Sequence, residues 1–143
     1  HDNNVRLTGI IYLYEITQPR MTGTAKKNIN MFSKLVGRDG FKNVILVTTK
    51  WDKLNDPQEG EKRESELKDG FEFKGRKNEG YWISMLSLGA GIKRHNGTTE
   101  SAERILREFI GKDPTDLAIL REIVDERKEL NNTNAGREIN KDL

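Results

Sequence analysis

The chain has 143 residues, of which 25 are Lys or Arg and 23 are Asp or Glu, so its net charge is +2 at neutral pH. Charged residues make up 34% of the chain, against roughly 25% in an ordinary soluble domain, and hydrophobic residues make up another 34%. This length and composition predict one domain with a modest core and a highly charged surface. The balance of charge gives no strong field for attracting nucleic acid, which is not expected as a partner.

The rare residue types exclude several kinds of site. The sequence has no cysteine, which excludes disulfides, thiolate nucleophiles, iron–sulfur clusters and zinc sites with thiolate ligands. Its two histidines, His1 and His95, cannot build a histidine-rich metal centre, and no G-x-S-x-G motif supports a serine triad. The apolar runs are far shorter than the about 20 residues of a membrane helix, so no membrane span is predicted and a cytoplasmic location is the default expectation.

The first third of the chain predicts a strand, a helix and a second strand. Residues 7–14 are a nearly continuous β-branched and aromatic run, typical of a strand covered on both faces. Apolar residues then recur at helical spacing over 25–36, and Gly37 is placed to end this helix. A second buried strand is predicted over residues 42–49.

The middle of the chain predicts two more helices. A charged, exposed helix is expected over residues 58–68, after a turn at Asp56-Pro57, and an irregular glycine- and lysine-rich segment continues as far as Gly80. Residues 81–88 are rich in aromatic and aliphatic side chains and predict a short buried helix.

The last third predicts a weaker strand over residues 92–95 and then two helices. Thr99 can cap the first of these helices, which carries an apolar face. Asp113-Pro114 is expected to start the second, a charged C-terminal helix with an apolar stripe that ends near Leu130.

This alternation predicts an α/β fold of about three parallel strands with flanking helices, because parallel neighbours need a crossover that is usually helical. Residues 1–112 would form this unit, and residues 113–143 a charged C-terminal helix and tail. Ligands of such sheets lie beyond the carboxyl ends of the strands. The segments after the three predicted strands are therefore the places to look for function.

The segment after the second strand carries the sharpest motif. Thr49-Lys50-Trp51-Asp52 fits the [N/T]-K-x-D element with which P-loop GTPases recognise guanine. A carboxylate at Asp52 can accept hydrogen bonds from guanine N1–H and from its exocyclic amino group. Adenine offers an acceptor at N1 and has no amino group at C2, so the same carboxylate disfavours it.

The other residues of the motif have secondary roles in this interpretation. Lys50 can lay its methylene stem across the base plane, and Thr49 can tie the loop to neighbouring backbone, although one hydroxyl replaces the commoner asparagine amide. Trp51 either shields the base edge or packs on its own strand. An ordinary strand-end turn with solvated Lys50 and Asp52 is the alternative to a binding loop.

Several blocks of the sequence, in order from about residue 7 to residue 136, carry a wider resemblance. The chain resembles fungal G-domain-containing proteins related to septins and immunity-associated GTPases through LTGIIYLYEI, PRMTGTAKKNINMF, KNVILVTTKWDKL, EGEKRESELK, RHNGTTESAERIL and LREIVDERKEL with the later AG. Neither GxxxxGK[ST] nor DxxG occurs in it. The resemblance therefore implies the second half of a P-loop GTPase domain, cut from a longer protein, without the half that holds phosphate and magnesium.

The resemblance also implies ligands and site residues. It places GTP or GDP at Thr49, Lys50 and Asp52, with Mg²⁺ only where the missing half is present. Arg94, His95 and Asn96 match the place of the last base-contacting loop, although a lone histidine at a strand end is often only solvated. Arg20-Met21-Thr22 resembles a segment used in switch or dimer contacts, so a homodimer across the nucleotide face is a possible assembly. A simple connection with Thr22 or Thr24 as helix cap is the alternative for that segment.

No residue of the chain is an obvious catalyst, and we expect the chain alone to be inactive as a GTPase. If the chain is the second half of a sheet, its first strand should lie at an uncovered edge. The competing interpretation is a non-catalytic G-like scaffold that engages a partner through its C-terminal helix. Another α/β enzyme of unknown chemistry is a third possibility, for which the sequence has no motif.

Overall fold

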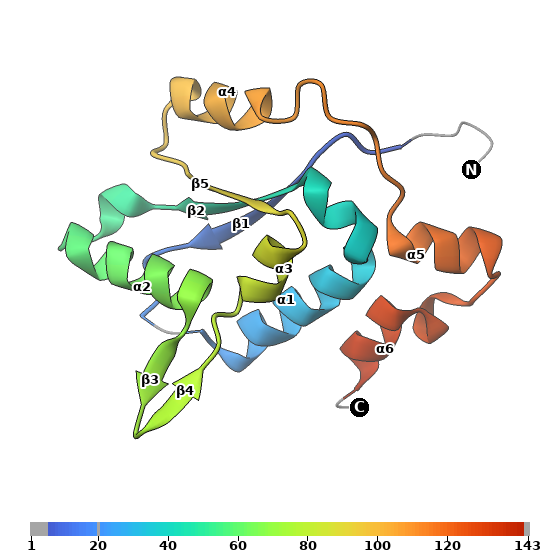
Figure 1. The fold of residues 1–143 in the computed structure, drawn as a ribbon, viewed down its shortest axis with the longest axis horizontal. Coiled ribbons are helices and arrows are strands. Elements are labelled where there is room, and N and C mark those ends of the chain that lie inside the picture. The colour runs from blue at the N-terminus through green and yellow to red at the C-terminus, as the bar shows by residue number, and fades with distance from the viewer. Residues whose placement is uncertain (1–5, 20, 142–143) are drawn as a thin grey trace.

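The computed structural model describes residues 6–19 and 21–141. Its centre is a parallel sheet in the order β1-β2-β5, formed by β1 (Ile10–Glu15), β2 (Val44–Thr49) and β5 (Gly91–Arg94) (Figure 1). Both neighbouring pairs are parallel, with Glu15 opposite Thr49 and Thr48 opposite Arg94. The predicted α/β class with three parallel strands is therefore confirmed.

Helices cover the sheet from two sides (Figure 1). On one face, α1 (Gly23–Val36), α2 (Pro57–Asp69) and α3 (Ile83–Ser87) pack over Val44 and Leu46 and form the larger core cluster. On the other face, α4 (Thr99–Arg107) and the turn after it pack over Ile45 and Val47. Successive side chains of β2 are thus buried on opposite faces of the sheet, which explains why most of its residues are apolar.

Local signals in the sequence explain the ends of the helices. Thr22 caps α1 by accepting a hydrogen bond from Ala25 N at 3.0 Å, and Gly37, with φ of 80°, ends it. Asp56 caps α2 through Gln58 N at 2.9 Å, and Pro57 occupies the first turn. Short 3₁₀ turns, η1 (Arg38–Asn43) and η2 (Trp51–Lys53), flank β2.

One face of β1 is more exposed than its sequence predicts. Ile11 is 37% exposed and Leu13 is 64% exposed, while Tyr14 on the opposite face is buried. The cause is that α4 covers β2 and does not extend over β1. The prediction of a strand covered on both faces is therefore wrong for β1. Its expected position at a sheet edge agrees with the observed strand order.

The segment predicted to be irregular is an antiparallel hairpin. Its strands are β3 (Phe71–Phe73) and β4 (Arg76–Asn78), and it projects from the body beneath α2 (Figure 1). Lys74 and Gly75 connect them with φ of 49° and 72°, the left-handed pair of a tight hairpin turn. Three-residue strands are too short to show a clear alternation, which is why the pattern gave no strand signal.

The predicted continuous C-terminal helix is wrong. Pro114 is not helical, because its neighbour Thr115 pairs with Leu7 through two backbone hydrogen bonds of 2.7 and 3.1 Å. The rest of the chain forms a series of short pieces. These are α5 (Ala118–Leu120) and α6 (Asn134–Asn140), which contact α1, and between them the π-helical turn η3 (Arg121–Asp125) and η4 (Leu130–Asn132). The buried Glu122 joins two of them by accepting from Asn134 N at 2.9 Å.

The pair Lys34–Glu138 attaches α6 to α1 at 2.6 Å, and Glu138 is 6% exposed. The hydrogen bond from Lys34 lowers the pKa of Glu138 below its ordinary 4.5 despite the burial. Its stabilising contribution is present above the unfolded-state pKa and is lost as the pH falls through the lowered folded-state value. Glu138→Gln is therefore expected to lower the free energy of unfolding by about 1–2 kcal/mol at pH 7 and to weaken its acid dependence.

Urea denaturation at pH 7 and pH 3, followed by circular dichroism, tests this prediction. The matched control is Glu103→Gln, which removes a carboxylate from an exposed pair with Arg107 and is expected to cost less than about 0.5 kcal/mol. Equal losses in the two variants at pH 7 would contradict the role assigned to Glu138.

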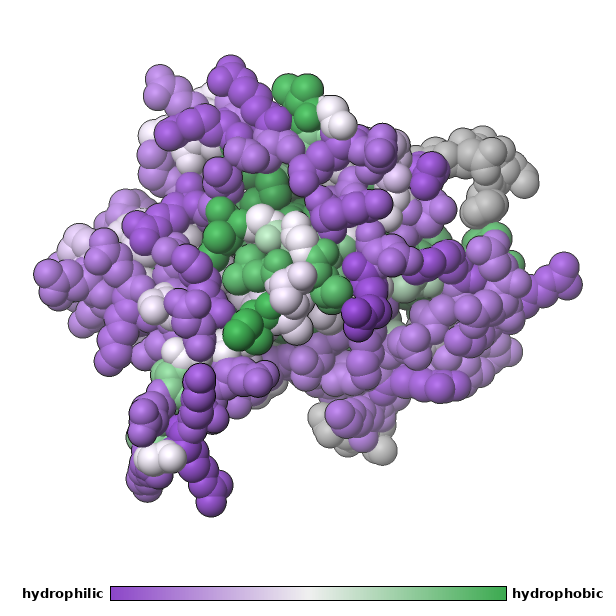
Figure 2. Space-filling view, in the orientation of Figure 1, coloured by the Kyte–Doolittle hydropathy of each residue, from purple (hydrophilic) through white to green (hydrophobic). Residues whose placement is uncertain are grey.

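The surface agrees with the composition. Figure 2 shows hydrophilic residues over most of the molecule, with apolar residues gathered near the middle of the view, where β5 and α3 lie in Figure 1. Within the described residues, no helix combines the length and hydropathy of a membrane span.

Candidate functional site

The three strands bring their following loops together at one edge of the sheet. Because Glu15 lies opposite Thr49, the ends of β1 and β2 coincide. His95 N donates to Thr48 O at 2.8 Å, so the chain after β5 begins beside the end of β2. The predicted residues Thr49, Lys50 and Asp52 therefore share this carboxyl edge with His95 and Asn96, where ligands of parallel sheets bind.

The loop after β2 reverses direction at Lys50. This residue has φ of 62°, a left-handed conformation that is uncommon outside glycine and recurs at functional sites. Its ammonium lies 2.8 Å from the carboxylate of Glu15 on β1. The Thr49 hydroxyl lies 3.5 Å from the carbonyl oxygen of Tyr14, a long contact in the direction expected for a loop tether.

Trp51 is held within the protein. Its Nε1 donates to the Thr48 hydroxyl at 2.9 Å, and its ring lies against Gly60 of α2. The guanidinium of Arg94 lies 4.1 Å from the ring centroid, within range of a cation–π contact. Of the two roles considered for Trp51, packing is therefore the observed one, although it packs on α2 and β5 as well as on its own strand.

Arg94, at the end of β5, joins the loop after β2 to α2. It makes two hydrogen bonds to Glu64, of 2.9 and 2.8 Å, and this contact raises the pKa of Arg94 further above its ordinary value. A two-bonded Arg–carboxylate pair has a fixed geometry. Arg94 thus links Glu64 of α2 to Trp51, the residue immediately before Asp52.

The carboxylate of Asp52 is exposed. Its side chain is 64% exposed, and its ion-pair neighbour is Lys53 at 3.8 Å. That distance is beyond a hydrogen bond, so both carboxylate oxygens remain available as acceptors. The structure therefore presents a fixed loop that ends in an open carboxylate.

The loop after β5 is formed by its own hydrogen bonds. The buried Ser101 lies 3.0 Å from His95 Nδ1 and accepts from Asn96 N at 3.2 Å. Asn96 Oδ1 accepts from the amide and hydroxyl of Thr98 at 3.0 and 2.6 Å. Thr98 caps α4 by accepting from Ser101 N, which corrects the predicted cap at Thr99 by one residue.

The sequence motif did not identify Ser101, Glu64 or Gly60, because their importance depends on tertiary contacts. The local spacing Asn96-x-Thr98-x-x-Ser101 was the available signal for the loop, since it combines a turn-forming asparagine with a helix cap. The pairing of Arg94 with Glu64 has no sequence signal, because the two residues belong to different elements.

The remaining predicted site residues lie elsewhere or outside the described structure. Arg20 is not among the described residues, so its suggested interface role stays a prediction. Thr22 is the N-cap of α1, as its alternative interpretation proposed, and Met21 packs against the larger core cluster. Both line a cavity between α1 and α2.

Gly60 allows α2 to approach the loop after β2 closely. A Cβ atom there would lie 2.6 Å from Cζ3 of Trp51 and 2.5 Å from Cδ1 of Leu54. Alanine is favoured over glycine within a helix by about 1 kcal/mol, but forcing a methyl group into a packed contact costs about 1–3 kcal/mol. We expect Gly60→Ala to lower the free energy of unfolding by about 1 kcal/mol and to displace Trp51.

Urea denaturation and the tryptophan emission spectrum test this expectation. Gly23→Ala is the matched control, because no atom lies within 4 Å of a Cβ at that position in the first turn of α1. It should leave the emission unchanged and the stability equal or higher. A Gly60→Ala variant that is more stable than the parent would contradict this expectation, because it would show that the Trp51 ring moves aside at no cost in stability.

Comparison with protein-family models, with curated proteins and with solved structures gives no match. The family suggested by the sequence blocks therefore stays a prediction, and the functional argument depends on the site itself.

Proposed function

We propose that this chain is the guanine-recognising part of a nucleotide-binding α/β domain. The observation that carries the proposal is the open carboxylate of Asp52, at the end of the middle strand of a parallel sheet. The loop that holds it is fixed by Trp51 and Arg94, so little ordering is required on binding. The resemblance to G-domain-containing GTPases supports the same assignment.

The chemistry of recognition depends on the groups at this edge. Asp52 accepts hydrogen bonds from N1–H and the exocyclic amino group of guanine, and each is charge-assisted. Lys50, which is paired with Glu15 at the carboxyl end of β1, supplies a methylene stem beside the base. The loop of His95 and Asn96, held by Ser101, provides the other side of the site.

Hydrolysis is a separate matter. In the described residues, no group of three or more His, Asp or Glu side chains is arranged to hold a metal ion. We derive no step that uses Mg²⁺. GTP turnover and a homodimer across the nucleotide face, both implied by the resemblance, stay predictions for a protein that also contains a phosphate-binding half.

The scaffold alternative has lost its main structural support. It depended on a long charged C-terminal helix. Residues 113–141 instead form only short helical elements, of which α5 and α6 contact α1. We therefore develop the guanine-binding proposal alone.

Ligand-observed NMR on the 143-residue chain tests the proposal with GMP, IMP and AMP. Without a phosphate cradle, the affinity for GMP is expected to be millimolar at best and independent of Mg²⁺, because a few hydrogen bonds barely offset the cost of association. IMP lacks the amino group at C2 and should bind about tenfold more weakly than GMP. AMP should give no saturable signal. Equal binding of GMP and AMP would refute the proposal.

A further inference from the structure

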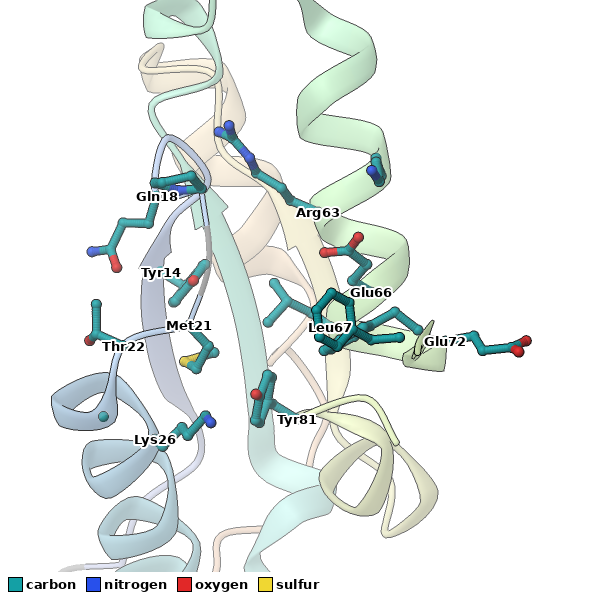
Figure 3. A pocket seen from close by; sticks show the side chains of 15 residues that line it. Tyr14, Gln18, Met21, Thr22, Lys26, Arg63, Glu66, Leu67, Glu72 and Tyr81 are labelled. Atoms are coloured by element: carbon teal, nitrogen blue, oxygen red, sulfur yellow. The ribbon is translucent and has the colours of Figure 1, made fainter. Parts of the chain in front are cut away.

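The cavity that Met21 and Thr22 line lies between the start of α1 and the middle of α2, at the carboxyl end of β1 (Figure 3). Its volume is about 900 Å³, within the range of small-molecule sites. None of the predicted base-binding residues Thr49, Lys50, Trp51, Asp52, His95 and Asn96 lines it. It is therefore a site separate from the one already proposed.

One part of the cavity is apolar and aromatic. Leu67 of α2, Tyr81 from the segment before α3 and Met21 from the loop before α1 line it (Figure 3). Phe71, the first residue of β3, lines it as well. These side chains come from four separate segments and offer a ring-sized apolar surface. Such a surface favours a ligand with an aromatic or aliphatic body.

The opposite part holds a hydroxyl without a partner. Tyr14 lines the cavity and is 8% exposed, and its hydroxyl has no hydrogen bond to any other described residue. Burial raises the pKa of Tyr14, so the hydroxyl is protonated and can donate at neutral pH. Because Tyr14 lines the cavity, its hydroxyl can donate to an acceptor on a ligand there.

The first turn of α1 lines the same cavity as Tyr14. Thr22 caps only Ala25 N, so the amides of Gly23 and Thr24 have no partner within the helix. A helix of 14 residues also concentrates positive potential at this end. Lys26 lines the cavity one turn further along, with its ammonium 5.3 Å from the centroid of the Tyr81 ring.

Acidic groups on the other wall limit the charge that the cavity accepts. Glu66 and Glu72 line the α2 and hairpin side, whereas Lys26, Lys62 and Arg63 supply the cations. Arg63 is already engaged with Ile16 O at 3.0 Å and Glu59 at 3.3 Å. The arrangement therefore favours one negative charge near α1 over a multiply charged ligand.

We propose that this cavity binds a small organic monocarboxylate with an apolar body. The carboxylate accepts from the Tyr14 hydroxyl and the free amides at the start of α1, close to Lys26. The apolar body lies against Leu67 and Phe71. This proposal does not depend on guanine binding.

Saturation-transfer NMR on the full chain, with 4-phenylbutyrate as the probe, tests it. We expect a saturable signal for 4-phenylbutyrate and binding about tenfold weaker for the neutral 4-phenylbutanamide and for phenyl phosphate, which carries two charges at pH 7.5. Tyr14→Phe and Lys26→Gln should each weaken 4-phenylbutyrate binding about tenfold. GMP should not compete with it.

The control variant is Arg104→Gln, which removes one positive charge from the exposed side of α4, on the opposite face of the sheet. It should bind 4-phenylbutyrate like the parent. Circular dichroism verifies folding, and Lys26→Gln, an exposed change, decides the question if Tyr14→Phe is unstable. Equal binding of the amide and the carboxylate, tighter binding of phenyl phosphate, or unchanged binding in folded Lys26→Gln would each overturn the proposal.

Discussion

Asp52→Asn is expected to abolish detectable GMP binding and to create binding of xanthosine monophosphate. Two charge-assisted hydrogen bonds to guanine are lost, which costs on the order of 3 kcal/mol, or about a hundredfold in affinity. An asparagine amide donates to the oxygen at C2 of xanthine, where guanine carries an amino group. The mutation therefore exchanges one base preference for another, an outcome that general damage to the protein would not produce.

The measurement is ligand-observed NMR with both nucleotides on the parent and the variant. Asp69→Asn is the matched control, because it makes the same charge change at the exposed end of α2. It should keep the parent's preference for GMP. Retained GMP binding in Asp52→Asn would remove Asp52 from the site.

Trp82→Ala is expected to have the largest effect on stability. Trp82 has no exposed surface and is the largest fully buried side chain of the described structure. Its ring meets that of Tyr14 edge to face, with centroids 5.8 Å apart. Removing such a side chain costs about 3–5 kcal/mol, a large part of the roughly 5–15 kcal/mol by which domains are stable.

Trp82→Phe separates packing from hydrogen bonding. The indole Nε1 of Trp82 is buried without a partner among the described residues. Phenylalanine loses part of the packing but also removes this unsatisfied donor, whose burial costs about 1–3 kcal/mol. We therefore expect Trp82→Phe to lose less than half as much stability as Trp82→Ala. Urea denaturation followed by circular dichroism measures both, and an alanine variant within about 1 kcal/mol of the parent would contradict this account of the core.

The elements that local sequence could predict are those whose signals lie within them. The apolar run of β2 and the periodic face of α1, with its cap at Thr22 and its stop at Gly37, were sufficient for their assignment. The hairpin at Lys74-Gly75 was missed because its strands are short. Pro114 was misassigned because Thr115 pairs with Leu7, far away in the sequence, and only the folded chain shows that pairing.

For the candidate site, too, some features could be predicted from the local sequence and others could not. The position of Asp52 after a buried strand can be read from the sequence, since strand and motif are adjacent. The contacts of Arg94 with Trp51 and Glu64 cannot be read from it, because they join a strand, a loop and a helix. Physical contacts between distant segments determine how rigid the loop is, and local patterns contain no information about them.

The location of bound guanine tests the central claim most directly. Amide chemical shifts of the isotope-labelled chain should be followed during titration with GMP, with AMP as the comparison. The shifts caused by GMP alone are predicted to concentrate at Lys50, Asp52 and the loop of His95 and Asn96. Shifts that concentrate instead around the cavity of Tyr14 and Lys26, or that are identical for GMP and AMP, would contradict it.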